Sequence, residues 1–356
     1  MKKTLNKTKI ADFATYIGVV IAFIVMNALM NEGLLTRSMK GQLVPICCYI
    51  VMAVSLNLTV GILGELSLGH AGFMSVGAFT GVVTAMSLQS AIPSDGVRLA
   101  LAIVMGAIFA GIAGTLVGIP VLRLHGDYLA IVTLAFGEII KELINCLIIG
   151  HDENGLHIIF NATGAKTVTD LGLTETGKVL IKGAQGATGT DTIASFTAGF
   201  ILIMVTLVVV LNLVRSRSDR ALMALRDNRI AAESVGINVT KYKLMAFVTC
   251  AALAGGAGAL YGLNFSNLVS SKFDFNTSIL ILVFVVLGGL GNMWGSIIAA
   301  AVLTVLPEAL RGFADYRMLI YAIVLIVVML ATNSPQMKAL LSKLVPFGKK
   351  GEKEHA

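Results

Sequence analysis

Long runs of apolar residues, separated by short polar stretches, recur along the whole chain. A helix needs about 20 mostly apolar residues to cross a bilayer. Such runs predict about ten crossings, some of them short, at residues 13–30, 45–61, 61–85, 99–122, 128–149, 193–214, 244–263, 278–290, 294–310 and 318–332. The pattern therefore predicts an all-α, polytopic membrane protein, with residues 1–356 forming a single transmembrane domain.

Small residues repeat at every fourth position in several of these runs. The repeats are Gly106, Ala110, Gly114 and Gly118; Ala251, Gly255 and Ala259; and Gly77 and Gly81. This spacing lets helix backbones approach closely inside a bilayer, so we expect tight packing between the helices that carry it. Glycine clusters also interrupt residues 61–85 and 278–310, which are candidates for broken or re-entrant helices.

The polar stretches predict which side of the membrane each loop occupies. Basic residues collect at the N-terminus, in residues 215–243 and in the tail 333–356, and such residues favour the cytoplasmic side. We therefore expect both termini to be cytoplasmic. Residues 150–192 are rich in glycine and threonine and contain no apolar run long enough to cross, which predicts a long external loop.

Composition narrows the class of protein. Of the 356 residues, 56% are hydrophobic and 13% are charged, and the mean hydropathy is +0.86; soluble domains carry about 25% charged residues. The net charge of +7 lies mainly in loops and tails. This placement is typical of loops held on the cytoplasmic side and of contact with anionic lipid, and it does not indicate nucleic-acid binding. The four cysteines fall in apolar runs, so neither a metal site nor a disulfide is expected.

The sequence contains no motif for enzyme chemistry or for ATP binding. The phosphate-binding loop G-x-x-x-x-G-K-[ST] is absent, as are the zinc-protease and serine-hydrolase motifs. We therefore expect no catalytic residue, no metal and no cofactor on this chain. Uphill transport would then draw its energy from a separate subunit or from an ion gradient.

Four ionisable residues lie within or beside the apolar runs. Glu65 and His70 fall at a run boundary, where they are either interfacial residues or part of a broken helix beside a transport pathway. Glu138 and Lys141 fall inside residues 128–149, one helical turn apart. They either face the pathway or form an internal ion pair that orients the helix.

Residues 215–243 form the densest basic segment of the chain and also predict a short helix over 219–235. Ser218 can cap its start, and Gly236 suits its end. Small or apolar residues share one face, at Ala221, Leu225, Ala232 and Val235. Such a helix suits docking into a groove of a soluble partner; the alternative is a solvated charged loop.

Several stretches resemble one known family. Ile230–Gly236 is similar to the E-A-A-x-x-x-G coupling segment of ATP-binding-cassette permeases, through Ala231, Ala232 and Gly236. Three longer stretches resemble the permeases of bacterial branched-chain amino-acid importers, the LivM type: RALMALRDNRIAAESVGINVTKYKLMAFVTCAALAGGAGALYG, LSLGHAGFMSVGAF and LAFGEIIKEL.

This resemblance implies a permease subunit in the bacterial cytoplasmic (inner) membrane. Its partners would be a second homologous permease, two ABC ATPase subunits that bind the ATP, and an extracytoplasmic solute-binding protein. Contact with the ATPases would come from Arg226, Arg229, Ala231, Ala232, Glu233 and Gly236. The resemblance favours leucine, isoleucine and valine as substrates. Related permeases carry urea, other amino acids or nucleosides, and an ion-coupled transporter or channel remains the alternative mechanism.

Overall fold

The computed structural model of the chain describes residues 2–33, 36–121, 127–152, 155–161, 168–171, 177–310, 319–320, 322–323 and 325–326. The predicted tail 333–356 and most of the predicted span 318–332 lie outside these residues. Contacts within the chain divide it into two compact units, Met1–Ala301 and Val302–Ala356. The features described below belong to the first unit, and the single domain expected from the sequence stays a prediction.

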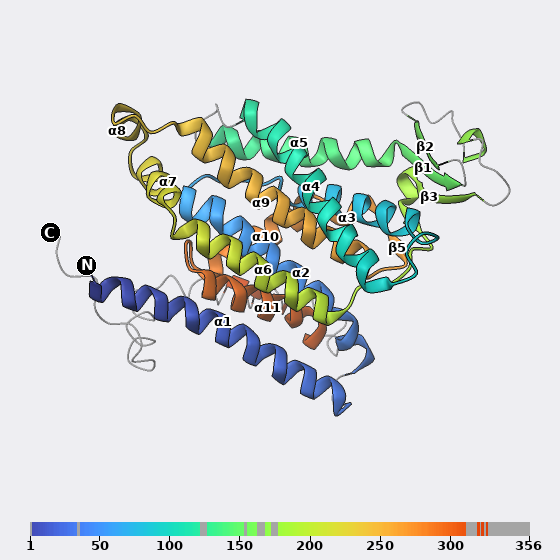
Figure 1. The fold of residues 1–356 in the computed structure, drawn as a ribbon, viewed down its shortest axis with the longest axis horizontal. Helices are drawn as coiled ribbons and strands as arrows, with labels where there is room; N and C mark the ends of the chain where they lie inside the picture. Colours follow the sequence, from blue (N-terminus) through green and yellow to red (C-terminus); the bar gives the residue numbers. More distant parts are fainter. Residues whose placement is uncertain are drawn as a thin grey trace. The chain divides into compact units, whose positions relative to one another are not determined.

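Most of the described residues are helical (Figure 1). The longer helices are α1 (Lys2–Asn31), α2 (Arg37–Asn57), α3 (His70–Ser87), α4 (Asp95–Val121), α5 (Asp127–Asn145), α6 (Phe196–Val214), α9 (Val239–Gly262), α10 (Phe275–Gly288) and α11 (Met293–Ala309). The shorter ones are η1 (Leu58–Leu63), η2 (Val168–Leu171), η3 (Gly183–Gln185), η4 (Ser270–Phe273), α7 (Arg217–Asp227) and α8 (Arg229–Ser234).

Six helical segments among the described residues are long and apolar enough to cross a membrane. They are Phe13–Asn31, Arg37–Leu63, Asp95–Val121, Phe196–Val214, Val239–Gly262 and Ser270–Gly288. Helices α3, α5 and α11 also occupy positions predicted as crossings. The fold is therefore that of a polytopic membrane protein, while the count of about ten crossings and the cytoplasmic placement of both termini stay predictions.

Helices α3, α4 and α9 pack closely through their small residues. A Cβ atom added to Gly77 of α3 would overlap the backbone of Gly255 in α9. On α4, a Cβ atom added to Gly106 would lie 2.9 Å from the Cβ atom of Ala259, also in α9. The stripes predicted from four-residue spacing thus meet one another, as helices do where no side chain separates their backbones.

The stretch between α2 and α3 is a broken helix. Helix α2 continues into the single π-helical turn η1, which ends at Gly64 in the left-handed conformation with φ of 77°. Helix α3 begins only at His70. Glu65 lies within this break and His70 starts the next helix, so both belong to a broken helix; whether they lie at an interface or beside a pathway stays a prediction. A comparable break separates α10 from α11, as the glycine cluster predicted, with positive φ at Gly289 and Gly291.

A small antiparallel sheet forms at one end of the helices. Its strands are β1 (Leu147–Asp152), β2 (Gly155–Phe160), β3 (Lys178–Lys182), β4 (Ala187–Thr188) and β5 (Asn267–Leu268), in the order β2-β1-β3-β4-β5. The all-α expectation is therefore incomplete, and the predicted loop 150–192 contains strands where it is described. Helix α5 also stops at Asn145, earlier than the predicted crossing 128–149, because the chain then continues into β1.

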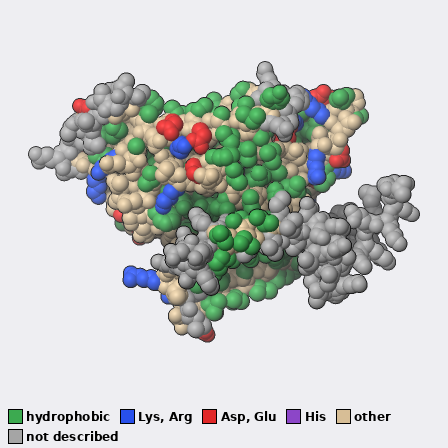
Figure 2. Space-filling model, turned by 180° about the vertical axis from the view of Figure 1, so that it is seen from behind, with side chains coloured by type: hydrophobic (Ala, Val, Ile, Leu, Met, Phe, Trp, Pro, Cys, Tyr) green, Lys and Arg blue, Asp and Glu red, His purple; other side chains and the backbone are tan. Residues whose placement is uncertain are grey.

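The connections between helices gather at two opposite ends. Helices α7 and α8 lie at the left of Figure 1, and strands β1, β2 and β3 lie at the right. In Figure 2, hydrophobic side chains form a broad band across the middle of one face, with charged side chains mainly to either side. This distribution is typical of a protein embedded in a bilayer, because charged groups are costly within the hydrocarbon layer.

Candidate functional site

The segment between α6 and α9 folds as two short helices and not as the single predicted helix over 219–235. Ser216 caps α7, since its Oγ atom accepts a hydrogen bond from the Ser218 backbone N–H at 3.1 Å; Ser218, the predicted cap, lies inside the helix. Asn228 has an extended backbone and caps α8 by accepting from the Ala231 N–H at 3.1 Å. An asparagine side chain competes for backbone hydrogen bonds, which explains the interruption.

One face of this segment packs inside the protein. Leu225, Ala232 and Val239 form a buried cluster that joins α7, α8 and α9. The sequence predicts that the face with Ala221 and Leu225 docks into a partner, but these residues are buried within the chain, and Val235 is 76% exposed and does not belong to this face. Ala232 is only 3% exposed and contacts its own chain.

Outside this buried cluster, the segment also exposes large apolar side chains. Ile230 is 80% exposed, Val235 is 76% exposed, and Met223 is also exposed. We call these three residues the apolar coupling surface. The sequence prediction places Val235 on the small-residue face and names neither Met223 nor Ile230 as a contact residue.

Four other residues predicted to contact the ATPases lie in α8 or just after it. Arg229 donates from Nε to Glu233 Oε1 at 3.1 Å, an exposed pair one helical turn apart. Ala231 is exposed, and Gly236 ends α8 with φ of 85°, as predicted. Burial raises the pKa of the Asp219 carboxyl above its usual value, so the packed face of α7 disfavours its charge.

Arg226 connects α7 to the helix break. Its Nη1 atom donates to the Gly61 carbonyl oxygen in η1 at 2.8 Å. Its aliphatic part covers Gly64, where an added Cβ atom would lie 2.9 Å from Arg226 Cγ. This geometry does not test the predicted contact of Arg226 with an ATPase. The Nη1 atom, however, already has a hydrogen-bond partner within the chain.

A buried ion pair lies beside the same break. Lys243 Nζ contacts Glu65 Oε1, and the two side chains are 7% and 16% exposed. Lys243 lies near the start of α9, so the pair joins α9 to the segment after η1. Sequence analysis could not assign this partner, because the two residues are 178 positions apart.

His70 has a packing role in the structure. Its Nε2 atom lies 2.9 Å from Ser55 Oγ, and both side chains are buried. The Ser55 hydroxyl also lies 2.9 Å from the Met52 carbonyl oxygen, and the tautomer of His70 decides which group donates between His70 and Ser55. This hydrogen bond joins the start of α3 to α2.

Glu138 and Lys141 form an ion pair within α5, and whether the pair faces a pathway stays a prediction. Their side chains are partly exposed on the same helix. Among the described residues, no ion pair or hydrogen bond connects them to Glu65 or His70, so the four candidate pathway residues form two separate groups.

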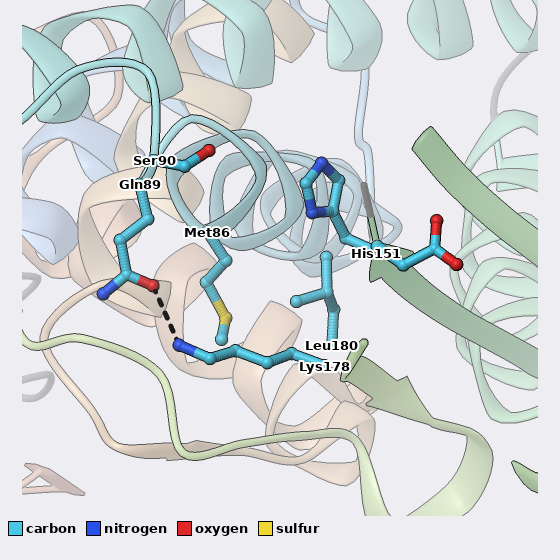
Figure 3. A pocket seen from close by; sticks show the side chains of 7 residues that line it. Met86, Gln89, Ser90, His151, Lys178 and Leu180 are labelled. Carbon is cyan, nitrogen blue, oxygen red and sulfur yellow. Dashed lines mark hydrogen bonds between the residues drawn. The ribbon is translucent and has the colours of Figure 1, made fainter. Parts of the chain in front are cut away.

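The opposite end of the molecule holds a small open pocket of about 210 Å³ between α3 and the sheet (Figure 3). Lys178 of β3 donates to Gln89 Oε1 at 3.4 Å, and Gln89 Nε2 donates to Asp191 Oδ2 at 2.8 Å. Arg98 at the start of α4 pairs with Asp191 at 3.4 Å. These contacts fasten the sheet to the ends of α3 and α4.

The long apolar helices are those of a polytopic membrane protein. Residues 38–330 match the family described as "Branched-chain amino acid transport system / permease component", and the chain belongs to this family.

Among curated proteins, the chain is 34% identical over 292 residues to the "High-affinity branched-chain amino acid transport system permease protein LivM" of Escherichia coli (strain K12). It is equally similar to the protein of that name from Salmonella typhimurium. Each match covers 79% of this chain and 66% of the relative, so the chain spans just under two thirds of their length. No solved structure matches it significantly.

Proposed function

We propose that this chain is the membrane-spanning subunit of an ATP-driven importer of branched-chain amino acids in a bacterial cytoplasmic membrane. Its partners are a second homologous permease, two ATPase subunits and an extracytoplasmic solute-binding protein. The family and the names of the two relatives support the substrate, which would be leucine, isoleucine or valine. Urea, other amino acids and nucleosides are the alternative cargoes within this kind of permease.

The observation that carries this proposal is the apolar coupling surface. Ile230 and Val235 are among the most exposed large apolar residues that the structure describes, yet they belong to a segment rich in charged residues. An exposed apolar patch with a polar surround favours contact with a protein partner. An ATPase groove that receives α7–α8 would cover this surface and leave Ala232 in its intrachain cluster.

The mechanism is alternating access driven from the cytoplasmic side. Closure of the two ATPases on ATP moves α7–α8, and Arg226 transmits the movement to η1 through the Gly61 carbonyl group. The Glu65–Lys243 pair keeps the start of α9 attached to the same break. The permease pair then opens outward and accepts solute from the binding protein.

The ion-coupled alternative would use Glu65, His70, Glu138 or Lys141 as a proton or sodium relay. Three of these residues have ion-pair partners, and His70 is hydrogen-bonded to Ser55 in a buried position. These contacts favour structural roles for the four residues. Collapse of uptake on removal of an ion gradient, with ATP present, would support the alternative.

We expect Val235→Glu to prevent docking of the ATPases. A charge at the centre of an apolar interface costs about 2 kcal/mol or more, so recovery of the ATPase subunits with the permease should fall about tenfold or more. The measurement is co-purification of the ATPases at fixed expression, with the thermal midpoint of the permease recorded in parallel.

Thr240→Glu is the matched control, because Thr240 is exposed near α8 but lies outside the apolar coupling surface. This variant should retain the ATPases. Full ATPase recovery and normal uptake with Val235→Glu, at an unchanged thermal midpoint, would argue against this docking surface.

A further inference from the structure

We propose that Arg226, Gly61 and Asn57 form a relay that carries movement of α7 to the break between α10 and α11. The inference rests on the proposed function and assigns a positioning role to Asn57, a residue within the apolar run of α2. Asn57 is fully buried at the point where α2 changes into the π-helical turn η1.

The Asn57 side chain is directed at the α10–α11 break through both of its polar atoms. Its Oδ1 atom accepts from the Gly291 backbone N–H at 2.8 Å, and its Nδ2 atom donates to Ser296 Oγ at 3.0 Å. Ser296 donates its only hydroxyl proton to the Asn292 carbonyl oxygen at 3.1 Å. Its oxygen must therefore accept from Asn57, and this fixes the orientation of the amide.

Gly61 stands between Asn57 and Arg226. A Cβ atom at Gly61 would overlap both Asn57 Oδ1 and the Gly291 backbone nitrogen, so only a glycine allows this approach. The Gly61 carbonyl oxygen accepts from Arg226 Nη1 at 2.8 Å and would lie 3.6 Å from a Cβ atom added to Gly291. One residue of η1 thus contacts both the coupling helix and the α10–α11 break.

The segments that the relay joins have backbones suited to changing conformation. Single π-helical turns are frequent at functional sites, and η1 is such a turn. Gly64, Gly289 and Gly291, which flank the contacts, all have positive φ. Glycine crosses between backbone regions without steric cost, so these positions can act as hinges. A pull on Arg226 would move η1, and Asn57 would move the turn before α11 with it.

The test uses the full transporter, reconstituted in vesicles with its binding protein, and measures leucine taken up per ATP hydrolysed. The variants are Arg226→Met, Asn57→Leu and the double variant. Each single variant should lower the ratio about fivefold or more, the range of ordinary coupling between sites. Because both residues act through Gly61, the double variant should lose no more than the worse single variant.

A spectroscopic measurement separates a positioning role from a structural one. Spin labels at exposed Leu290 and Ser90, in a chain whose four cysteines are replaced, report the distance from the α10–α11 break to the opposite end. In the wild type this distance should change on ATP binding. In Arg226→Met, the distance between the two labels without ATP should equal that of the wild type, but ATP binding should no longer change it. The ATPases should still co-purify with this variant.

Two further variants complete the design. Lys241→Met removes an exposed basic side chain near α8 and should leave the ratio unchanged. Ser296→Ala removes only the acceptor of Asn57 Nδ2 and should also lower the ratio. It replaces Asn57→Leu in the test if that variant does not fold. An unchanged ratio in both Arg226→Met and Ser296→Ala, or losses that multiply in the double variant, would overturn the relay and leave the proposed function standing. A wild-type complex without ATP-driven uptake would overturn both.

Discussion

Replacing Gly258 with alanine should destabilise the core of the protein by about 3 kcal/mol, near the upper end for an overpacked site. Gly258 of α9 lies against α3 so closely that an added Cβ atom would overlap the Met74 carbonyl oxygen. Because the obstacle is backbone and not a flexible side chain, α3 and α9 would have to separate. The measurement is the unfolding free energy in mixed detergent micelles, together with the amount of folded protein recovered from membranes.

Gly256 provides a control two residues away on the same helix. A Cβ atom there would meet Ile103 Cγ2 at 3.6 Å, an ordinary van der Waals distance. Gly256→Ala should therefore keep or slightly raise the stability, since alanine is the better helix former. Equal stabilities for Gly256→Ala and Gly258→Ala would show that α3 and α9 do not pack as described.

Replacing Lys243 with methionine should cost about 3–5 kcal/mol, the usual effect of removing one partner of a buried ion pair. The substitution leaves the Glu65 carboxylate without its partner, in a site where its side chain is only 16% exposed. The unfolding free energy of the variant, measured under the same micelle conditions, tests this expectation.

The double variant Glu65→Gln with Lys243→Met separates charge from packing. Without either charge the desolvation cost disappears, so most of the lost stability should return. Lys241→Met, on the same helix but exposed, should change the stability by about 0.5 kcal/mol or less. If Lys243→Met were as stable as Lys241→Met, the pair would contribute nothing to holding α9 against the helix break.

Local periodicity predicted those parts of the fold that depend on one helix at a time. The four-residue spacing in α4 and α9 identified the packing faces, and the glycine cluster after α10 identified a break. Each of these signals is complete within about 20 residues, the length of one crossing. The small-residue contacts of Gly106 and Gly255 therefore followed from sequence.

Contacts between distant segments could not be predicted in this way. Lys243 and Glu65 come together only because α9 packs beside η1, and β5 joins the sheet from beyond α9. The sheet escaped notice because its strands are six residues or shorter and lie in a stretch of mixed polarity. The family resemblance located the predicted coupling segment. That Ala232 is buried and Val235 is exposed could not be predicted, because it depends on the interruption of the helix at Asn228.

The central claim is that this protein is a gate driven by ATPase subunits that it does not contain. The most direct measurement is uptake of labelled leucine into vesicles that hold the chain alone, or the chain with its second permease, ATPases and binding protein. The account predicts accumulation only in the complete assembly with ATP, and none with the chain alone under an imposed proton or sodium gradient. Accumulation by the chain alone under such a gradient would contradict it.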